Sequence, residues 1–300
     1  MSSTRRFGIF GRLKTGLKLT RDSLAVLRHH PDLMLFPLAG GIVSLLFGAV
    51  LYFGVFVGGV VGGGLEYIAL FVFYFATTFL ASFFTAALVY SVNDAFHGRN
   101  PTLRNGMAAA WGMKGPLAIW SVISAVVGVL LNALENSDSG LARIAGAFFA
   151  LGWTITTFFI IPVIVFEDVS TKEMFSKSAG TFRNTWGETL GAGFGIGLVQ
   201  LGIGLFGAAI VVAIGGGLFV LVPAVGISVV VLGLGVVCVG TYLVGQTVHG
   251  IAKTALYIYA AEGTVPDEFD DFDFDTLDGR TGGQSMSRDQ SNSPTMTSFK

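Results

Sequence analysis

The chain has 300 residues, of which 52 % are apolar and only 12 % are charged, and its formal net charge at pH 7 is −1. A soluble domain carries about 25 % charged residues, so this composition excludes an ordinary soluble fold and predicts an all-α, polytopic membrane helix bundle. The one cysteine, Cys238, excludes a disulfide framework within the chain. The four histidines lack metal-ligand spacing, so we expect no metal. We also expect no cofactor and no nucleic-acid partner.

Residues 1–32 form a basic segment before the first apolar run. Apolar residues recur near helical spacing, and cations lie on another face: Phe10, Leu13, Leu17, Leu24 and Leu27 against Lys14, Lys18, Arg21 and Arg28. This pattern predicts an interfacial helix that contacts the bilayer and anionic lipid headgroups. A segment whose charges only set the membrane orientation is the alternative, and both interpretations can hold together.

Six apolar stretches follow, each long enough to cross a hydrocarbon core of about 30 Å. The predicted spans cover residues 35–57, 67–92, 115–134, 144–166, 190–214 and 224–248. The last two share 64 residues without Asp, Glu, Lys or Arg, and we place their turn at Gly215–Gly217 and Pro223. The sixth helix is expected to continue to about Ala261. After it, residues 263–300 form an acidic tail that is expected to be disordered.

Two polar connectors, 93–114 and 167–188, are each expected to form an amphipathic helix. In the second, Ser170 and Glu173 have the spacing of a capping box. An apolar stripe in the same connector predicts a helix lying in the headgroup region: Met174, Phe175, Phe182 and Trp186. Each connector also has an acidic start and a later Trp-Gly pair, which predicts a parallel internal repeat with the N-terminal helix as a truncated copy. Chance similarity between two short loops is the alternative.

The distribution of cations predicts the topology. With six spans, the N-terminal segment, both connectors and the C-terminal part fall on one side and carry 7, 3, 3 and 4 Lys or Arg, which is 17 of the 18. The positive-inside rule makes that side cytoplasmic. We therefore expect a multi-pass protein of the cell (cytoplasmic) membrane with both termini in the cytoplasm.

Polar side chains gather at the predicted cytoplasmic ends of spans 2, 4 and 6. They form a candidate polar vestibule: Asn93, Asp94, His97, Glu167, Asp168, Gln246, His249 and Lys253. Gln246, His249 and Lys253 follow at i, i+3 and i+7 and share one helical face. Ion pairs that only fix the helix ends are the alternative interpretation. Pro162 is a candidate hinge in span 4, with a static kink as the simpler interpretation.

Three segments carry a resemblance to known sequences: RLKTGLKLTRDSLAVLRHHPDLMLFPLAGGI, IIPVIVFEDVSTKEMFSKSAGTFRNTWGE and ALYIYAAEGTVPDEF. Over roughly residues 10–268 the chain resembles a prokaryotic family of uncharacterised six-span integral membrane proteins. More distantly, it is similar to the membrane domain attached to some glycerophosphodiester phosphodiesterases. The family has no established activity, so the resemblance implies the fold and no catalytic residue.

Three functions are compatible with this sequence. The first is a transporter or permease-like protein for a small solute or lipid, and the second is a structural or accessory protein that binds partners through its connectors or tail. The third is an enzyme acting on lipid headgroups, which requires Asp94, His97, Glu167 and His249 to meet. No HExxH, GxSxG or complete phosphate-binding loop occurs, so we expect no enzyme. The lack of mid-membrane charges argues against a proton- or ion-coupled carrier.

Overall fold

The computed structural model of the chain describes residues 9–54, 65–167, 169–263 and Phe269, and these contain helices and no strand. The elements are α1 (Ile9–His29), the 3-10 helix η1 (Pro31–Met34), α2 (Leu35–Tyr52), α3 (Leu65–Phe96), α4 (Leu103–Gly112), α5 (Lys114–Glu135), α6 (Gly140–Thr157), α7 (Ile160–Phe166), α8 (Thr171–Asn184), α9 (Trp186–Leu221) and α10 (Pro223–Glu262).

Six helical segments of the described residues are long and apolar enough to cross a membrane. They are Pro31–Tyr52, Tyr67–Phe96, Lys114–Glu135, Gly140–Phe166, Gly195–Leu221 and Pro223–Ala261. This confirms the predicted all-α membrane bundle. The predicted disordered tail lies outside the described residues except for Gly263 and Phe269, and the buried ring of Phe269 meets the ring of Phe96 edge-on at a centroid distance of 5.7 Å.

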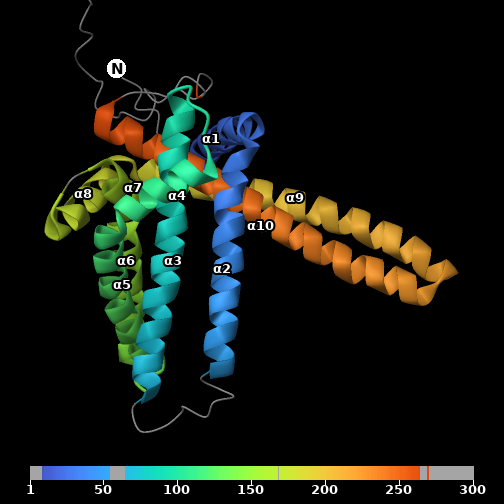
Figure 1. Cartoon of the computed structure of the whole chain (residues 1–300), viewed down its shortest axis with the longest axis horizontal. Helices are drawn as coiled ribbons and strands as arrows, with labels where there is room; N and C mark the ends of the chain where they lie inside the picture. Colours follow the sequence, from blue (N-terminus) through green and yellow to red (C-terminus); the bar gives the residue numbers. More distant parts are fainter. Residues whose placement is uncertain (1–8, 55–64, 168, 264–268, 270–300) are drawn as a thin grey trace, which may run out of the picture.

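A short helix precedes each pair of long segments. Helix α1 leads into α2 and α3, α4 leads into α5 and α6–α7, and α8 leads into α9 and α10. The three short helices lie at the same end of the bundle, here called the basic end (Figure 1). This succession agrees with the predicted parallel repeat, but the registers differ. Trp111 and Gly112 end α4, whereas Trp186 and Gly187 begin α9.

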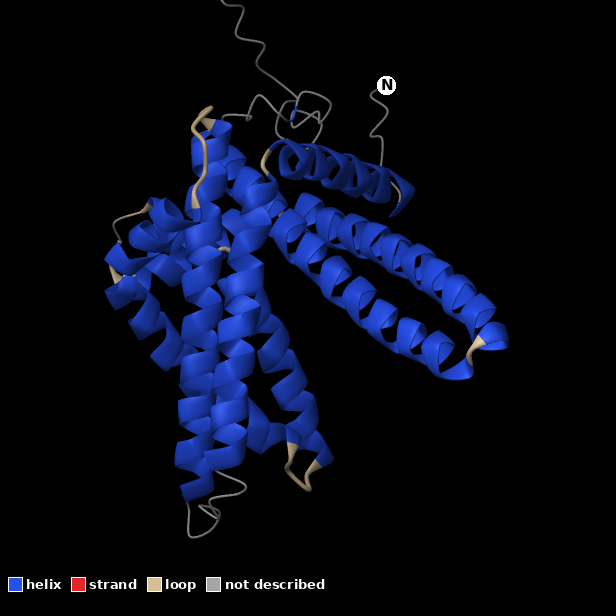
Figure 2. Ribbon diagram, turned by 45° about the vertical axis from the view of Figure 1, so that its right-hand side comes forward, coloured by secondary structure: helices blue, strands red, loops and turns tan. Residues whose placement is uncertain are grey.

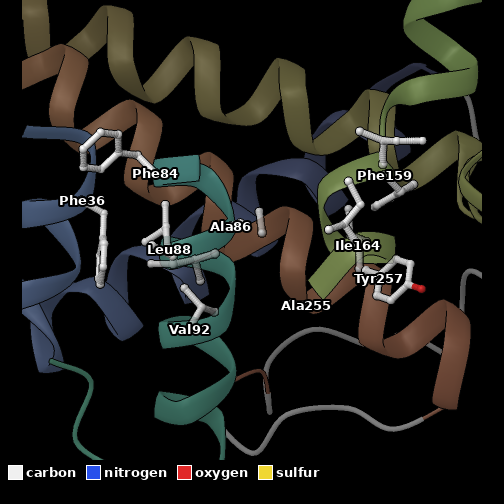
Figure 3. Close-up of a cluster of buried hydrophobic side chains, with 14 of the residues drawn as sticks. Phe36, Phe84, Ala86, Leu88, Val92, Phe159, Ile164, Ala255 and Tyr257 are labelled. Atoms are coloured by element: carbon white, nitrogen blue, oxygen red, sulfur yellow. The ribbon is translucent and has the colours of Figure 1, made fainter. Parts of the chain in front are cut away.

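The buried core is concentrated at the basic end. Side chains from α2, α3, the α6–α7 region and α10 meet there (Figure 3), among them Phe36, Phe84, Leu88, Phe159 and Tyr257. Farther along the long helices, large apolar side chains are exposed, such as Leu46, Phe148 and Leu205. Such helices present the apolar outer surface that hydrocarbon requires.

Much of the apolar faces of α1 and α8 contacts protein, which corrects the expectation that these faces lie against the bilayer. Leu27 of α1 and Met174 and Phe182 of α8 are buried in the core, whereas Leu17 is exposed. The physical reason is that the ends of the long helices offer apolar surface that the short helices cover. The side chains of Phe10, Leu13 and Trp186 lie outside the described residues. Exposed cations remain on the outer faces: Lys18, Arg21, Arg28, Lys172 and Arg183.

Helix α8 begins and packs as its sequence dictates. The predicted capping box is present, because the Ser170 hydroxyl accepts from the backbone N–H of Glu173 and the Glu173 carboxylate accepts from that of Ser170. The hydroxyl and the backbone N–H of Ser170 together lower the pKa of Glu173. Phe175 then packs against the stacked rings of Trp120 and Trp153, which fixes α8 to α5 and α6.

Glycine residues in α9 allow close packing inside the chain. Helix α1 packs along α9, and a Cβ placed on Gly195 would lie 2.5 Å from the backbone carbonyl of Gly16. Contact this close excludes any side chain at Gly195. Gly197 has open space around it, and Gly191 and Gly193 carry no described contact.

The predicted turn between the last two spans is confirmed at Pro223 and wrong at Gly215–Gly217. Gly215–Gly217 lies inside α9, and the chain turns at Val222, with Pro223 as the first residue of α10. The reason is again packing, since a Cβ on Gly215 would lie 2.3 Å from the side chain of Val230. These glycines therefore bring two long helices together and do not end one. The expected continuation of the sixth helix past the predicted span is present, because α10 extends to Glu262.

Candidate functional site: a pocket between α2, α3 and α10

The α9–α10 hairpin diverges from the rest of the bundle. In Figures 1 and 2 the helices α2, α3, α5 and α6 run in a similar direction, while the hairpin extends away from them. Helix α10 contacts α2 and α3 near the basic end and then continues outward with α9 as its main neighbour. The arrangement leaves a wedge between α2 and the hairpin, and the vertex of this wedge lies at the basic end.

A pocket of about 230 Å³ occupies this vertex. Its walls come from the first turns of α2, from the middle of α3 and from α10. The lining residues are Pro37, Gly40, Gly41, Ser44, Ala81, Phe84, Thr85, Leu88, Tyr242, Gln246, His249, Gly250 and Lys253. Helices α2 and α3 contribute an almost entirely apolar wall, and most of the polar groups come from α10.

The polar side chains of α10 form one stripe along the pocket. Tyr242, Gln246, His249 and Lys253 follow at i, i+4, i+7 and i+11, so they share a face and extend over about 16 Å of helix. Tyr242 and Gln246 are exposed, whereas His249 and Lys253 are partly buried. The pocket therefore has an open mouth at Tyr242 and a closed end at Lys253.

The Lys253 ammonium is the only cation among the described residues that line the pocket. It lies 4.3 Å from the centroid of the Phe158 ring, and this ring also meets His249 edge-on at 6.1 Å. The ion pairs Arg99–Asp94 and Lys177–Glu167 do not involve Lys253. A ring quadrupole offsets only part of the cost of removing an ammonium from water.

The predicted residues on α3 do not reach this pocket. Asp94 is buried and forms an ion pair of 2.7 Å with Arg99, which follows in the same connector. The ring of exposed His97 lies 2.8 Å, through Nδ1, from the backbone carbonyl of Asn93. These contacts fix the end of α3. They agree with the alternative interpretation, in which these residues form ion pairs at the helix ends and no vestibule.

Glu167 forms an ion pair within its own connector and also contacts α10. Its carboxylate forms an ion pair with Lys177 of α8 and accepts a hydrogen bond of 3.1 Å from the Tyr257 hydroxyl of α10. Asp168 lies outside the described residues. The candidate vestibule thus divides into two connector clusters and the α10 stripe. Among the residues that the structure describes, no group of three His, Cys, Asp or Glu side chains is placed to hold a metal ion.

Span 4 is broken one turn before Pro162. Helix α6 ends at Thr157 and α7 begins at Ile160, so Phe158 and Phe159 lie between two helices. Proline lacks an N–H for the carbonyl four residues earlier, which is that of Phe158. Within the break, the N–H of Phe159 donates to the Ser178 hydroxyl of α8 at 3.1 Å. The kink exists, and a hinge at Pro162 stays a prediction.

Three polar lining residues were absent from the predicted site. Tyr242 extends the face of Gln246 by one further turn, so the same helical spacing could have identified it. Ser44 and Thr85 stand alone in apolar spans, as many other Ser and Thr residues of the chain do. Only the packing of α2, α3 and α10 distinguishes them.

These features define a multi-pass α-helical membrane protein with a pocket between its helices at the basic end. The sequence model of a family of unknown function (DUF6159) matches residues 64–266, about two-thirds of the chain. The chain belongs to this family. No curated protein and no solved structure matches it, and the resemblance to the membrane domain of glycerophosphodiester phosphodiesterases has no support.

Proposed function

We propose that this protein takes up an amphiphile from the bilayer into the pocket between α2, α3 and α10, as one step in transporting it. The observation that carries the proposal is the position of the pocket at the vertex of the wedge. Its polar stripe lies on α10, and the helices that border the wedge are apolar on their outer faces. A ligand with a polar head and an apolar body matches both surfaces.

The size of the pocket supports a partly enclosed ligand. Sites that enclose a drug-sized molecule have volumes of about 300–1,000 Å³, whereas this pocket has about 230 Å³. It therefore fits a headgroup, while the apolar part of the ligand extends into the wedge. A lipid of the leaflet at the basic end would enter in this orientation without turning over.

We also propose that the basic end faces the cytoplasm in the cell membrane. Most Lys and Arg of the chain belong to this end, and the positive-inside rule places such segments in the cytoplasm. The exposed cations of α1 and α8, among them Arg21, Arg28 and Lys172, would then lie beside anionic headgroups of the inner leaflet.

A matched pair of glycine variants tests ligand entry. Gly41 lines the pocket and has open space around its Cβ position, so Gly41→Phe should fill the pocket without displacing the helix. Gly48 is also on α2 with open space around it and does not line the pocket, which makes Gly48→Phe the control. In proteoliposomes with a photoactivatable phospholipid, we expect Gly41→Phe to lower crosslinking to α2 and α10 by about fivefold or more.

The control variant should label as the unmodified protein does. Equal labelling of both variants would contradict entry through this pocket. The same proteoliposomes test transport, because a fluorescent phospholipid in one leaflet should reach the other faster than in protein-free vesicles. Exchange that is no faster than in empty vesicles would contradict the transport step.

A further inference from the structure

The charge of Lys253 indicates the chemical class of the ligand. We infer that the ligand carries an anionic headgroup, a phosphate or a carboxylate, that Lys253 binds at the closed end of the pocket. This inference rests on the proposed function and adds the chemistry of the headgroup. It depends on three observations about the pocket, which concern its charge balance, its donors and its depth.

The charge balance of the pocket is positive. None of the described lining residues is an aspartate or glutamate, and the described carboxylates of the predicted vestibule, Asp94 and Glu167, already pair with Arg99 and Lys177. The described contact of the Lys253 ammonium is the ring of Phe158. Charges within membrane segments are costly and, when present, are paired or functional. An anionic ligand supplies the missing charge.

The donors of the stripe suit an anion with several oxygens. Lys253 offers three N–H donors, the Gln246 amide offers two and the Tyr242 hydroxyl offers one. They lie along one face of α10, so an anion bound by Lys253 has further donors between it and the mouth of the pocket. Charge-assisted hydrogen bonds from an ammonium to phosphate or carboxylate oxygens are among the stronger ones in proteins.

The depth of the pocket favours a ligand that is still attached to the membrane. Thr85 lines the pocket and precedes Asp94 at the end of α3 by nine residues, which is about 14 Å of helix. The hydrocarbon core is about 30 Å thick, so the pocket lies within one leaflet. A headgroup bound there keeps its chains in the wedge, whereas a soluble phosphate ester would leave the wedge empty.

Lipid binding to the purified full-length protein tests this inference. Native mass spectrometry gives apparent affinities for phosphatidylglycerol, for diacylglycerol with the same chains and for glycerol 3-phosphate. We expect Lys253→Gln to weaken phosphatidylglycerol binding about tenfold or more, and Lys253→Arg to retain most of it. Diacylglycerol binding should be unchanged by either variant. Arg143→Gln, which removes an exposed charge on α6 at the opposite end of the bundle, is the control and should bind as the unmodified protein does.

A second variant keeps the test valid if Lys253→Gln does not fold. Gln246 is exposed at the mouth, so Gln246→Glu leaves the core intact and places a carboxylate on the face of Lys253. We expect it to weaken phosphatidylglycerol binding while diacylglycerol binding persists. Unchanged phosphatidylglycerol binding in Lys253→Gln, or in Gln246→Glu where the former does not fold, would overturn the anion assignment.

The remaining outcomes separate this inference from the proposed function. If Gly41→Phe abolishes lipid binding and Lys253→Gln does not weaken it, the pocket is used and only the anionic class is wrong. If Gly41→Phe changes nothing, the proposed function fails as well. Glycerol 3-phosphate that binds as tightly as phosphatidylglycerol would support the anion and assign it to a soluble ester, which overturns the membrane source.

Discussion

Gly195→Ala is expected to separate α1 from α9 and to destabilise the protein by about 1–3 kcal/mol, the usual cost of overpacking. The new Cβ would lie 2.5 Å from the carbonyl carbon and oxygen of Gly16. Backbone atoms cannot rotate aside as a flexible side chain can, so the two helices must move apart. Helix α1 precedes the first pair of long helices, α2 and α3, and packs along α9 of the third pair. This contact therefore fixes the base of the diverging α9–α10 hairpin.

The control for this prediction is Gly197→Ala, two residues farther along α9. Open space surrounds its Cβ position, and alanine in a helix interior is favoured over glycine by about 0.5–1 kcal/mol. The two variants should therefore shift the thermal midpoint of the detergent-purified protein in opposite directions. Gly195→Ala should also make α1 easier to cleave by proteases. Equal midpoints for the two variants would show that α1 and α9 are not in contact.

Phe159→Ala is expected to cost about 3–5 kcal/mol, as large-to-small changes of buried aromatic residues do. Phe159 is 0 % exposed and lies in the break between α6 and α7, with its ring 4.9 Å from that of Phe158 and 6.0 Å from that of Tyr257. Its removal leaves a cavity beside Phe158 and Tyr257 in the buried core.

Phe148→Ala is the matched control, because Phe148 on α6 is 72 % exposed and lipid or detergent replaces the lost ring. We expect a small change in thermal midpoint for this variant and a large decrease for Phe159→Ala. Phe159→Leu, which keeps most of the volume, should fall between them. Similar decreases for positions 148 and 159 would mean that the core is not centred at the basic end.

The sequence was sufficient where charges delimit the helices. The span predicted at 115–134 corresponds to α5, Lys114–Glu135, because charged residues mark both of its ends. The capping box at Ser170 was predictable because its two side chains are close in sequence. Gly215 misled the prediction because glycine, which favours turns in water, serves in apolar helices to bring partners such as Val230 close.

The site was predictable in part for a similar reason. Helical spacing alone placed Gln246, His249 and Lys253 on one face, and they line one pocket. Asp94 and Glu167 were grouped with them because all lie at the predicted cytoplasmic ends of the spans. Position in the sequence does not reveal that Arg99 and Lys177 pair with these carboxylates inside their own connectors. The wedge was beyond the sequence, since it depends on how α1 and α9 pack.

Helices α4 and α8 are expected on the same side of the membrane, and cysteine labelling in intact cells tests this directly. Cys238 is the single cysteine, so Cys238→Ser gives a background for one new cysteine at a time. Exposed positions are available on α4 (Ala108), on α8 (Ser176) and in the connector at the opposite end (Asp138). We expect a membrane-impermeant maleimide to label position 138 in intact cells, and positions 108 and 176 only after permeabilisation. Labelling of 108 and 176 from opposite sides would contradict the account.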